Sequence, residues 1–303
     1  MTLKRTVLIT GCSDHGLGAA LALAFHKAGW RVFASARNMA KLKQVETAGI
    51  EILQLDVTSD ESIANSVSAV KELTGGSLDA LVNNAGAAYN MPLMDIDIEK
   101  ARALFDLNTF SVITMTRAFL PLLMKSTSGA MVINNTSISS LSVFPFAAVY
   151  GASKAAATSF TEALRLELAP FGIKLINLMT GSVKSGIWDN APTPTLPPTS
   201  LYNIAKDVIE KAIGGGEIAD GADPIMWAEQ VVRDLEKRSP PHWIWRGRFT
   251  LQMRVICLLP IGFLDSTIRN LSGLTVLEQR IKEQGGVGNR DGSEADSSDR
   301  KNQ

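Results

Sequence analysis

The chain has 303 residues, of which 46% are hydrophobic and 20% charged, a composition typical of a packed globular core. Its 30 Lys and Arg residues balance 30 Asp and Glu residues, so no overall positive field favours nucleic acid as a partner. The two cysteines, Cys12 and Cys257, do not resemble a disulfide framework, and the three histidines lack metal-ligand spacing. We therefore expect a reducing compartment and no metal site. The apolar run after Lys4 and Arg5 is too short for a secretory signal, which predicts a cytoplasmic protein.

Short apolar runs alternate with segments of helical periodicity along most of the chain. The runs predicted as buried strands are, in chain order, 6–10, 31–36, 50–55, 78–83, 130–136 and 173–178. Helices are predicted between them, among others over 19–29, 59–73 and 150–169. Nearly continuous apolar strands separated by helices predict a parallel sheet covered on both faces. With right-handed crossovers, this α/β pattern predicts a Rossmann-type, doubly wound sheet flanked by helices.

A single catalytic domain is predicted over residues 1–284. Within it, residues 186–260 are expected to form a variable C-terminal cap over the substrate, because they carry no readable chemical motif. The tail 285–303 is polar and rich in Gly and Ser, so we expect it to be disordered.

A glycine-rich turn follows the first predicted strand and leads into an alanine-rich helix. Its sequence, TGCSDHGLG, lets the backbone turn tightly and approach a pyrophosphate at the helix N-terminus. Such a turn is a weak signal alone, but its place between a strand and a helix favours dinucleotide binding. The residues expected to contact the dinucleotide are Thr10, Gly11, Ser13, Gly16, Leu17 and Gly18.

The end of the second predicted strand favours NADP(H) over NAD(H). An acidic residue there would bind the ribose hydroxyls of NAD, whereas an arginine accommodates the 2′-phosphate of NADP. The strand ends in Ser35-Ala36-Arg37, without a carboxylate. Arg37 is therefore expected to bind the phosphate through its guanidinium group. Asp14 in the glycine turn is a mild argument against this assignment, because its charge would repel a phosphate.

Tyr150 and Lys154 share one face at the beginning of a predicted helix, because they are separated by one helical turn. A free tyrosine titrates near ~10 and is a poor acid or base at neutral pH. A nearby ammonium group and a positively charged oxidised nicotinamide would both favour the phenolate, so we expect a lowered pKa for Tyr150. A Tyr and a Lys at this spacing are common in helices, so the pair indicates a catalytic site only together with the motifs around it.

Together these motifs resemble the short-chain dehydrogenase/reductase family, over roughly residues 5–190. Ser137 precedes Tyr150 at the spacing that this family has for its catalytic serine. The matching pieces occur in the order of the family: the glycine turn, Asp56-Val57, Asn83-Asn84-Ala85-Gly86, Asn108, Ser137 and the Tyr150/Lys154 pair.

The resemblance implies roles for these residues. Ser137 would polarise a substrate carbonyl, and Tyr150 would donate the proton to the developing alkoxide. Lys154 would hold the nicotinamide ribose and tune Tyr150, and Asn108 would anchor a water of a proton relay. The resemblance places further residues along the cofactor cleft: Asp56 and Val57 at the adenine, then Asn83, Ala85 and Gly86, with Tyr150 and Lys154 at the nicotinamide end.

Two departures from the family pattern stand out. The glycine turn has four residues between its first two glycines, where the family has three, so which N–H groups face the phosphates is left open. Thr180-Gly181 stands where the family commonly has Pro-Gly. The Val183 backbone is still expected to meet the nicotinamide carboxamide, and Ser185 to replace a threonine near the cofactor phosphates.

Two branches of the family are similar to particular stretches of the chain. LITGCSDHGLGAALALAFHKAG and VFASARN resemble fungal NADPH-dependent reductases of the 1-acyldihydroxyacetone-phosphate reductase type. PFAAVYGASK resembles the hydroxysteroid-dehydrogenase branch. Both resemblances imply a small lipophilic carbonyl or alcohol substrate, and the family implies a homo-oligomer.

Segment 243–264 combines aromatic and basic residues with a run of apolar ones. The apolar run 255–264 is too short to span a bilayer, but Trp and Arg beside it suit a membrane interface. Two interpretations stay open: peripheral contact with a membrane such as the endoplasmic reticulum or a lipid droplet, or a lid over the substrate cleft. Either one predicts a lipophilic substrate.

These features predict an NADPH-dependent ketoreductase. The same residues would serve an NAD(P)-dependent alcohol dehydrogenase, so the direction stays open, as does a tailoring step on a polyketide or terpenoid. A cofactor-binding protein without turnover is a further alternative. It is disfavoured because binding alone would not require Ser137, Tyr150 and Lys154 together.

Overall fold

The computed structural model describes residues 4–185, 195–214 and 221–285. Its strands form one sheet that is parallel throughout, in the order β3-β2-β1-β4-β5-β6-β7. The predicted Rossmann-type sheet is confirmed, and six of its strands lie where the apolar runs predict them. The strands are β1 (Thr6–Ile9), β2 (Arg31–Ala36), β3 (Glu51–Gln54), β4 (Ala80–Asn83), β5 (Met131–Asn135), β6 (Lys174–Thr180) and β7 (Trp243–Arg246).

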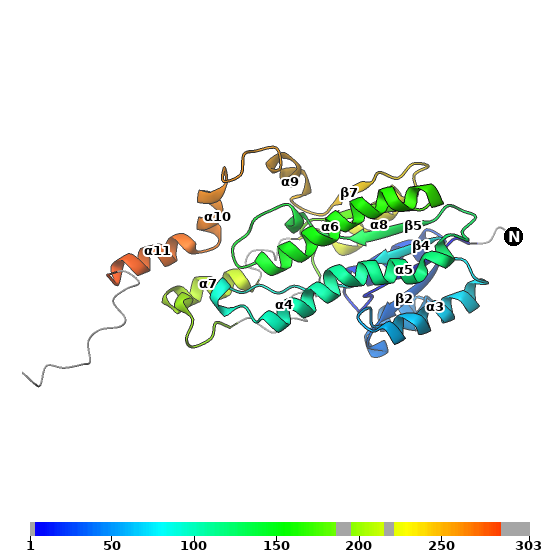
Figure 1. Ribbon diagram of the computed structural model, residues 1–303, viewed down its shortest axis with the longest axis horizontal. Helices are drawn as coiled ribbons and strands as arrows, with labels where there is room; N and C mark the ends of the chain where they lie inside the picture. The colour runs from blue at the N-terminus through cyan, green and yellow to red at the C-terminus, as the bar shows by residue number, and fades with distance from the viewer. Residues whose placement is uncertain (1–3, 186–194, 215–220, 286–303) are drawn as a thin grey trace, which may run out of the picture.

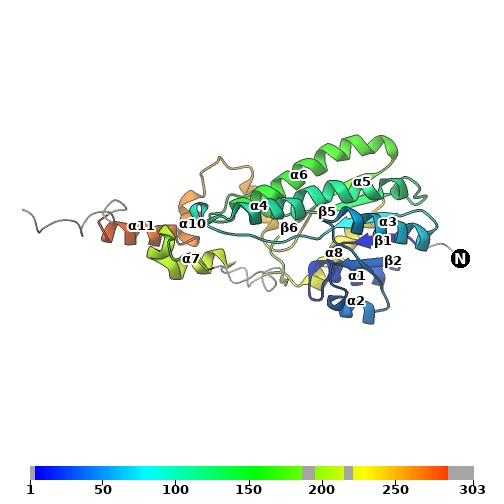
Figure 2. The same ribbon diagram turned by 60° about the horizontal axis from the view of Figure 1, so that its bottom comes forward.

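Helices cover both faces of the sheet (Figure 2). One face carries α1 (Leu17–Lys27), α2 (Lys43–Thr47) and α8 (Pro224–Leu235), which share one hydrophobic core with the strands. The other face carries α3 (Asp60–Thr74), α4 (Ile98–Phe105), α5 (Ser111–Leu123) and α6 (Ala148–Leu168). Side chains of α3, α5 and α6 form a second core there. Because apolar groups face helices on both sides, β1 and β4 are buried along their whole length.

The seventh strand corrects the expected cap at 186–260. β7 pairs with β6 at the edge of the sheet, and α8 packs against α1, so both belong to the Rossmann layers. Trp243-Ile244-Trp245 alternates as a strand does: Ile244 is buried, while the two tryptophans share one face and stack with ring centroids 5.6 Å apart. The start of the predicted apolar segment 243–264 is therefore sheet, not lid or membrane anchor.

The remaining C-terminal elements are α7 (Lys206–Ile213), α9 (Thr250–Ile256), α10 (Asp265–Leu271) and α11 (Leu274–Glu283). In Figure 1, α7, α10 and α11 lie toward the end of the molecule away from the N-terminus, and α9 lies between them and β7. A small separate core joins α7 and α11 to Phe146. The predicted disordered tail lies outside the described residues, apart from Gly285.

The chain order of the strands changes direction between β1 and β4. In open parallel sheets, ligands bind beyond the carboxyl ends of the strands at such a point. The glycine turn follows β1 there, and the residues after β4, β5 and β6 meet it at the same edge.

Candidate active site

A cleft of about 2140 Å³ opens at this edge of the sheet. It is larger than an ordinary small-molecule pocket of about 300–1,000 Å³, as expected where a dinucleotide and a substrate bind side by side. The predicted site residues that line it are Gly11, Ser13, Gly16, Leu17, Arg37, Val57, Ala85, Gly86, Ser137, Tyr150, Lys154, Val183 and Ser185. Those that do not line it are Thr10, Gly18, Asp56, Asn83 and Asn108.

The glycine turn forms a cradle in which side chains would not fit. Gly11 has a φ of +71°, and a Cβ on it would come 2.8 Å from the Ala85 Cα. Helix α1 begins just after Gly16, which gives no side-chain cap, and its first turn holds no acidic residue. The helix N-terminus thus offers free N–H groups and positive potential at the floor of the cleft. This geometry fits a dinucleotide pyrophosphate.

Two residues of the turn that were predicted to contact the cofactor, Thr10 and Gly18, support the turn without lining the cleft. A Cβ on Gly18 would lie 2.4 Å from the Gly11 carbonyl oxygen, so Gly18 lets helix α1 pack against the turn. The Thr10 hydroxyl accepts hydrogen bonds from the backbone N–H groups of Asn84 and Ala85, both at 3.0 Å. Thr10 therefore ties the end of β4 to the end of β1 and shapes the cleft without lining it.

The glycine turn has one residue more than the family pattern, and its Asp14-His15 part bonds to the segment before α2. The Asp14 N–H donates to the Lys41 carbonyl at 2.7 Å, and His15 adopts a left-handed φ of +62°. The Asp14 carboxylate accepts from the Gln44 backbone N–H at 2.8 Å. This hydrogen bond ties the turn to the beginning of α2, and Asp14 itself lines the cleft.

Arg37 is exposed at the end of β2 and lines the cleft beside Asn38 and Lys41. Among the described residues, no side chain hydrogen bonds with its guanidinium group. Asp56 lies near enough for the charge of Arg37 to act on it. Burial opposes ionisation of Asp56, but hydrogen bonds from Thr58 and the charge of Arg37 together lower the pKa of its carboxyl group. Asn38 and Lys41 were not singled out in the sequence, because a short loop after a strand has no periodicity to mark it.

Of the two asparagines at the end of β4, Asn84 and not the predicted Asn83 lines the cleft. The Asn83 side chain donates to Asn134 at 2.8 Å inside the sheet and is buried. Asn84 follows the strand, lines the cleft and donates to the carbonyls of Thr10 and Gly11 at 2.8 and 3.2 Å. Successive residues of a strand face opposite ways, so only one of the two could reach the cleft.

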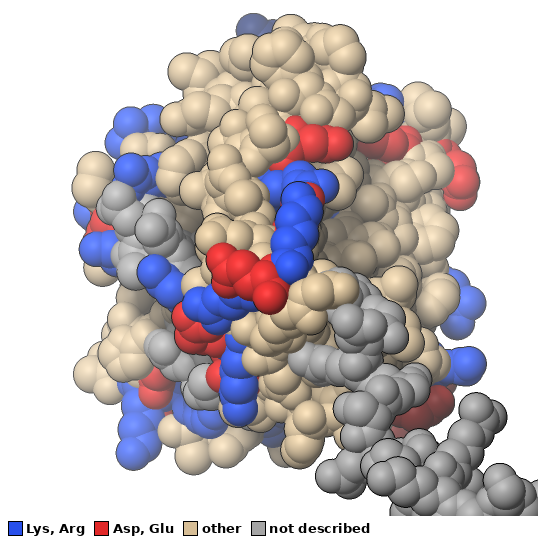
Figure 3. Space-filling model, turned by 90° about the vertical axis from the view of Figure 1, so that its left-hand side faces the viewer, with Lys and Arg blue, Asp and Glu red and all other residues tan. Residues whose placement is uncertain are grey.

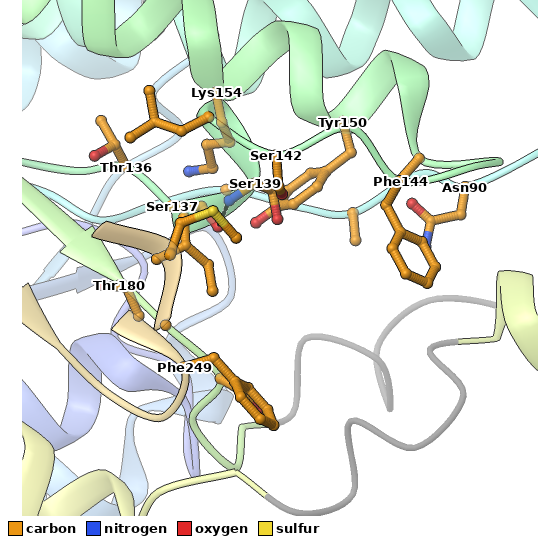
Figure 4. Close-up of a pocket in the computed structure, with 18 of the residues that line it drawn as sticks. Asn90, Thr136, Ser137, Ser139, Ser142, Phe144, Tyr150, Lys154, Thr180 and Phe249 are labelled. Carbon is orange, nitrogen blue, oxygen red and sulfur yellow. Dashed lines mark hydrogen bonds between the residues drawn. The ribbon is translucent and has the colours of Figure 1, made fainter. Parts of the chain in front are cut away.

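Ser137 and Tyr150 line the same part of the cleft (Figure 4). Ser137 follows β5, and Tyr150 lies in the first turn of α6. The Ser137 hydroxyl oxygen also accepts the Ser139 backbone N–H at 3.1 Å. Because the Ser139 N–H already occupies an acceptor position of the Ser137 oxygen, the Ser137 hydroxyl proton is available for donation to Tyr150 or to a substrate oxygen.

The environment of Tyr150 acts on its pKa in two ways. Burial raises the pKa of the phenol above its ordinary value, and the neighbouring Ser137 hydroxyl offsets this rise only in part. The Lys154 ammonium donates to the Asn135 carbonyl at 2.9 Å. The lowering expected from Lys154 together with an oxidised nicotinamide stays a prediction.

Lys154 is buried at the floor of the cleft. Burial lowers the pKa of its ammonium group to about 8. A Cβ on Gly86 would lie 3.4 Å from Lys154 Nζ and 3.1 Å from Asn108 Oδ1. Gly86 thus leaves room for both predicted side chains.

Asn108 lies in a π-helical turn, Asp106–Phe110, between α4 and α5. Such turns often occur at functional sites. The Asn108 side chain accepts from the Ala87 N–H at 3.0 Å and donates to the Ala87 carbonyl at 2.9 Å. Its other N–H donates to the Ser153 hydroxyl at 3.1 Å. With both side-chain N–H groups engaged, Asn108 can donate to no water through its side chain, and its relay role stays a prediction.

Apolar side chains line the outer part of the cleft, beyond Tyr150. Figure 4 shows Phe144 and Phe249 on facing sides of this part, with the polar Ser139 and Ser142 near Tyr150 and Asn90 beside Phe144. Further apolar lining residues are Leu141, Val143, Met253, Ile256, Leu259, Ile261, Phe263 and Leu264. The arrangement joins a phosphate-binding turn, a proton donor and an apolar chamber in one cleft.

Comparison with known sequences agrees with this geometry. A family model described as short chain dehydrogenase matches residues 5–195. A short-chain dehydrogenase/reductase of Pestalotiopsis microspora is 44% identical over 286 residues, covering 93% of this chain and 99% of its own. An NADPH-dependent 1-acyldihydroxyacetone phosphate reductase of Schizosaccharomyces pombe is 36% identical over 282 residues, covering 89% and 94%.

Solved structures show the same architecture. A short-chain dehydrogenase from Streptomyces avermitilis has a TM-score of 0.73 at 26% identity, covering 92% of this chain and 98% of its own. A short chain dehydrogenase from Burkholderia cenocepacia, in complex with NADP, has a TM-score of 0.62 at 25% identity, covering 94% and 99%.

Proposed function

The chain belongs to the short-chain dehydrogenase/reductase family, and from this premise we propose that it is an NADPH-dependent reductase of a lipophilic carbonyl compound. Members of the family are oxidoreductases that act on CH–OH and C=O groups and use NAD(P). The observation that carries the proposal is the convergence of Ser137, Tyr150 and Lys154 at the junction of the dinucleotide cradle and the apolar chamber.

The site residues can perform the reduction in a simple order. The Ser137 hydroxyl donates to the substrate carbonyl oxygen and polarises it. The bound dinucleotide supplies the hydride to the carbonyl carbon. The Tyr150 phenol, protonated because burial raises its pKa, donates its proton to the oxygen as negative charge develops there. Lys154, one helical turn from Tyr150, carries a positive charge that would favour the phenolate that remains. The same residues would serve alcohol oxidation, the second candidate, with Tyr150 accepting the proton.

Arg37 supports NADPH as the cofactor. Its exposed guanidinium group lines the cleft beside Lys41, where a 2′-phosphate would find two cations. Relatives support the same assignment, since one is named as NADPH-dependent and one solved neighbour holds NADP.

The variant Arg37→Ala is expected to weaken NADPH binding about 10- to 100-fold, the effect of losing a charge-assisted hydrogen bond. NADH binding is expected to stay unchanged, because NADH lacks the phosphate. Isothermal titration with both cofactors measures the two affinities. An unchanged NADPH/NADH ratio in a folded variant would mean that another residue reads the phosphate.

The apolar chamber supports a lipophilic substrate. Its lining is largely apolar, with polar or charged side chains such as Asn90, Lys211 and Asp265 among the apolar ones, so an apolar body that carries polar groups fits it. The test is NADPH consumption with acyl-dihydroxyacetone phosphate, steroid ketones and a polyketide-like diketone. Turnover with one of these classes supports the proposal and narrows the substrate. No turnover with any of them, despite NADPH binding, would contradict it.

We further propose that α9, α10 and the loop between them touch a lipid surface. Neither helix has a buried residue, and Leu258 and Ile261 are 84% and 104% exposed. Residues 247–264 include Arg248 and Arg254 but no acidic residue, which complements an anionic membrane. Figure 3, which faces this end of the molecule, shows few charged side chains across its upper part. In the described residues, no helix is long and apolar enough to cross a bilayer.

The protein is expected to float with vesicles containing anionic lipid, and the double variant Leu258→Asp/Ile261→Asp to stay in the soluble fraction. As a matched control, Leu93→Asp/Met94→Asp changes two exposed apolar residues elsewhere and should still float. A wild-type protein that never floats would refute the contact. If light scattering shows instead that Leu258→Asp/Ile261→Asp splits an oligomer, the surface binds a second copy.

A further inference from the structure

A row of hydrogen-bonded side chains crosses the floor of the cleft at the ends of four strands. The Thr180 hydroxyl, at the end of β6, hydrogen bonds with Asn135 Oδ1 at 2.6 Å. Asn135 Nδ2, at the end of β5, donates to Asn84 Oδ1 at 2.8 Å. Asn84 Nδ2 donates in turn to the Thr10 and Gly11 carbonyls after β1. The row thus connects β6 to the glycine turn.

The glycine-turn end of the row fixes which group donates and which accepts in each of its hydrogen bonds. Two backbone carbonyls of the glycine turn can only accept, so the Asn84 side chain must present its N–H group to them and its oxygen to Asn135. Asn135 must then present its N–H group to Asn84 and its oxygen to β6. The residue at position 180 must therefore be a donor. Threonine is one, whereas the proline that commonly occupies this place in the family has no donor.

Asn135 also holds Lys154. Its backbone carbonyl accepts a hydrogen bond from Lys154 Nζ at 2.9 Å. Among the described residues, this is the one hydrogen bond that the ammonium group makes. No carboxylate holds the ammonium. The position of the ammonium in the cleft therefore depends on Asn135, whose backbone pairs with Leu178 of β6 and whose side chain is held by Asn84 and Thr180.

We propose that Thr180 is a positioning residue, whose hydroxyl fixes Asn135 and so holds the Lys154 ammonium in place for Tyr150. Thr180 is 8% exposed and is drawn in Figure 4 at the same end of the cleft as Ser137 and Lys154. The catalytic use of Lys154 rests on the proposed function. The control of Lys154 by Thr180 is a property of the protein alone and can be measured without a substrate.

Thr180→Val keeps the shape of the side chain and removes the donor, leaving Asn135 Oδ1 unsatisfied. The Asn135 carbonyl then holds the ammonium less firmly, so the pKa of Lys154, about 8 in the parent, is expected to fall by about half a unit. The measurement is the pH dependence of Lys154 acetylation in the protein without NADPH, followed by peptide mass spectrometry. Thr180→Ser keeps a donor and is expected to restore the parent titration.

The matched control is Thr161→Val. Thr161 is equally buried, and its hydroxyl accepts from Asn134, the neighbour of Asn135, at 2.9 Å, but it has no contact with Lys154. Thr161→Val is therefore expected to leave the titration of Lys154 unchanged. With a substrate in hand, Thr180→Val should lower kcat about 5- to 10-fold, the effect of one hydrogen bond, with little change in KM.

An unchanged Lys154 titration in folded Thr180→Val would overturn the proposal, as would an equal shift in Thr161→Val. Failure of the wild-type protein to reduce any carbonyl would count against the proposed function but would leave the titration experiment valid. The two failures are therefore distinguishable.

Discussion

Replacing Tyr150 by phenylalanine is expected to reduce turnover about 1,000-fold or more while NADPH still binds. The phenol hydroxyl lines the cleft together with Ser137, and positioned general acids contribute about 100- to 10,000-fold. Phenylalanine keeps the ring in its half-buried place on α6, so the cleft keeps its shape. Steady-state rates and NADPH titration on the same preparation separate lost chemistry from lost binding.

Tyr202→Phe is the matched control for this result. Tyr202 contacts Phe146 through its ring, with centroids 5.7 Å apart, and phenylalanine keeps that contact. We expect wild-type turnover from Tyr202→Phe. Substantial activity in Tyr150→Phe would show that another group supplies the proton and would refute the mechanism.

Replacing Lys154 by methionine is expected to lower turnover about 100-fold and, at neutral pH, to stabilise the protein without NADPH. Burial lowers the pKa of Lys154 from 10.5 to about 8, so folding carries an electrostatic cost on the order of 3 kcal/mol below pH 8. Losing the hydrogen bond to the Asn135 carbonyl offsets about 1 kcal/mol of the gain. The free energy of unfolding should therefore rise by about 2 kcal/mol at pH 7.

The pH dependence of this gain has a defined sign. Between about pH 8 and 10.5 the unfolded chain binds more protons at Lys154 than the folded one, so wild-type stability rises with pH across this window. The advantage of Lys154→Met should be full below pH 8 and shrink above it. Urea unfolding at several pH values measures it, and Lys71→Met, which removes an exposed charge on α3, should change stability by at most about 0.5 kcal/mol. A destabilised Lys154→Met at pH 7 would show that burial of the lysine is not costly.

Much of the fold could be predicted because strand and helix periodicities are local. Six strands, the long helix that carries Tyr150 and Lys154, and the turn after β1 all follow from apolar runs and glycines in sequence order. β7 could not be predicted in this way. Trp243-Ile244-Trp245 is short, and its aromatic residues read equally well as an interface. Only pairing with β6, far away in sequence, decides that it is a strand.

Site residues that belong to a motif could be predicted from the sequence. Those whose role depends on the direction of the side chain could not. The sequence pointed to Asn83, yet Asn84 faces the cleft, because the strand ends between them. The sequence places Lys154 one turn from Tyr150 without showing that its ammonium donates to the Asn135 carbonyl. Thr180 was noted only as a departure from the family pattern. Its partner Asn135 is distant in sequence and comes close only through strand pairing.

The most direct test of the proposed reaction is transfer of deuterium from NADPH, labelled at the nicotinamide hydride position, to a lipophilic ketone. The account predicts that mass spectrometry finds the deuterium on the carbinol carbon of the product, with wild-type protein and not with Tyr150→Phe. An alcohol product without the label, or equal labelling by Tyr150→Phe, would contradict it.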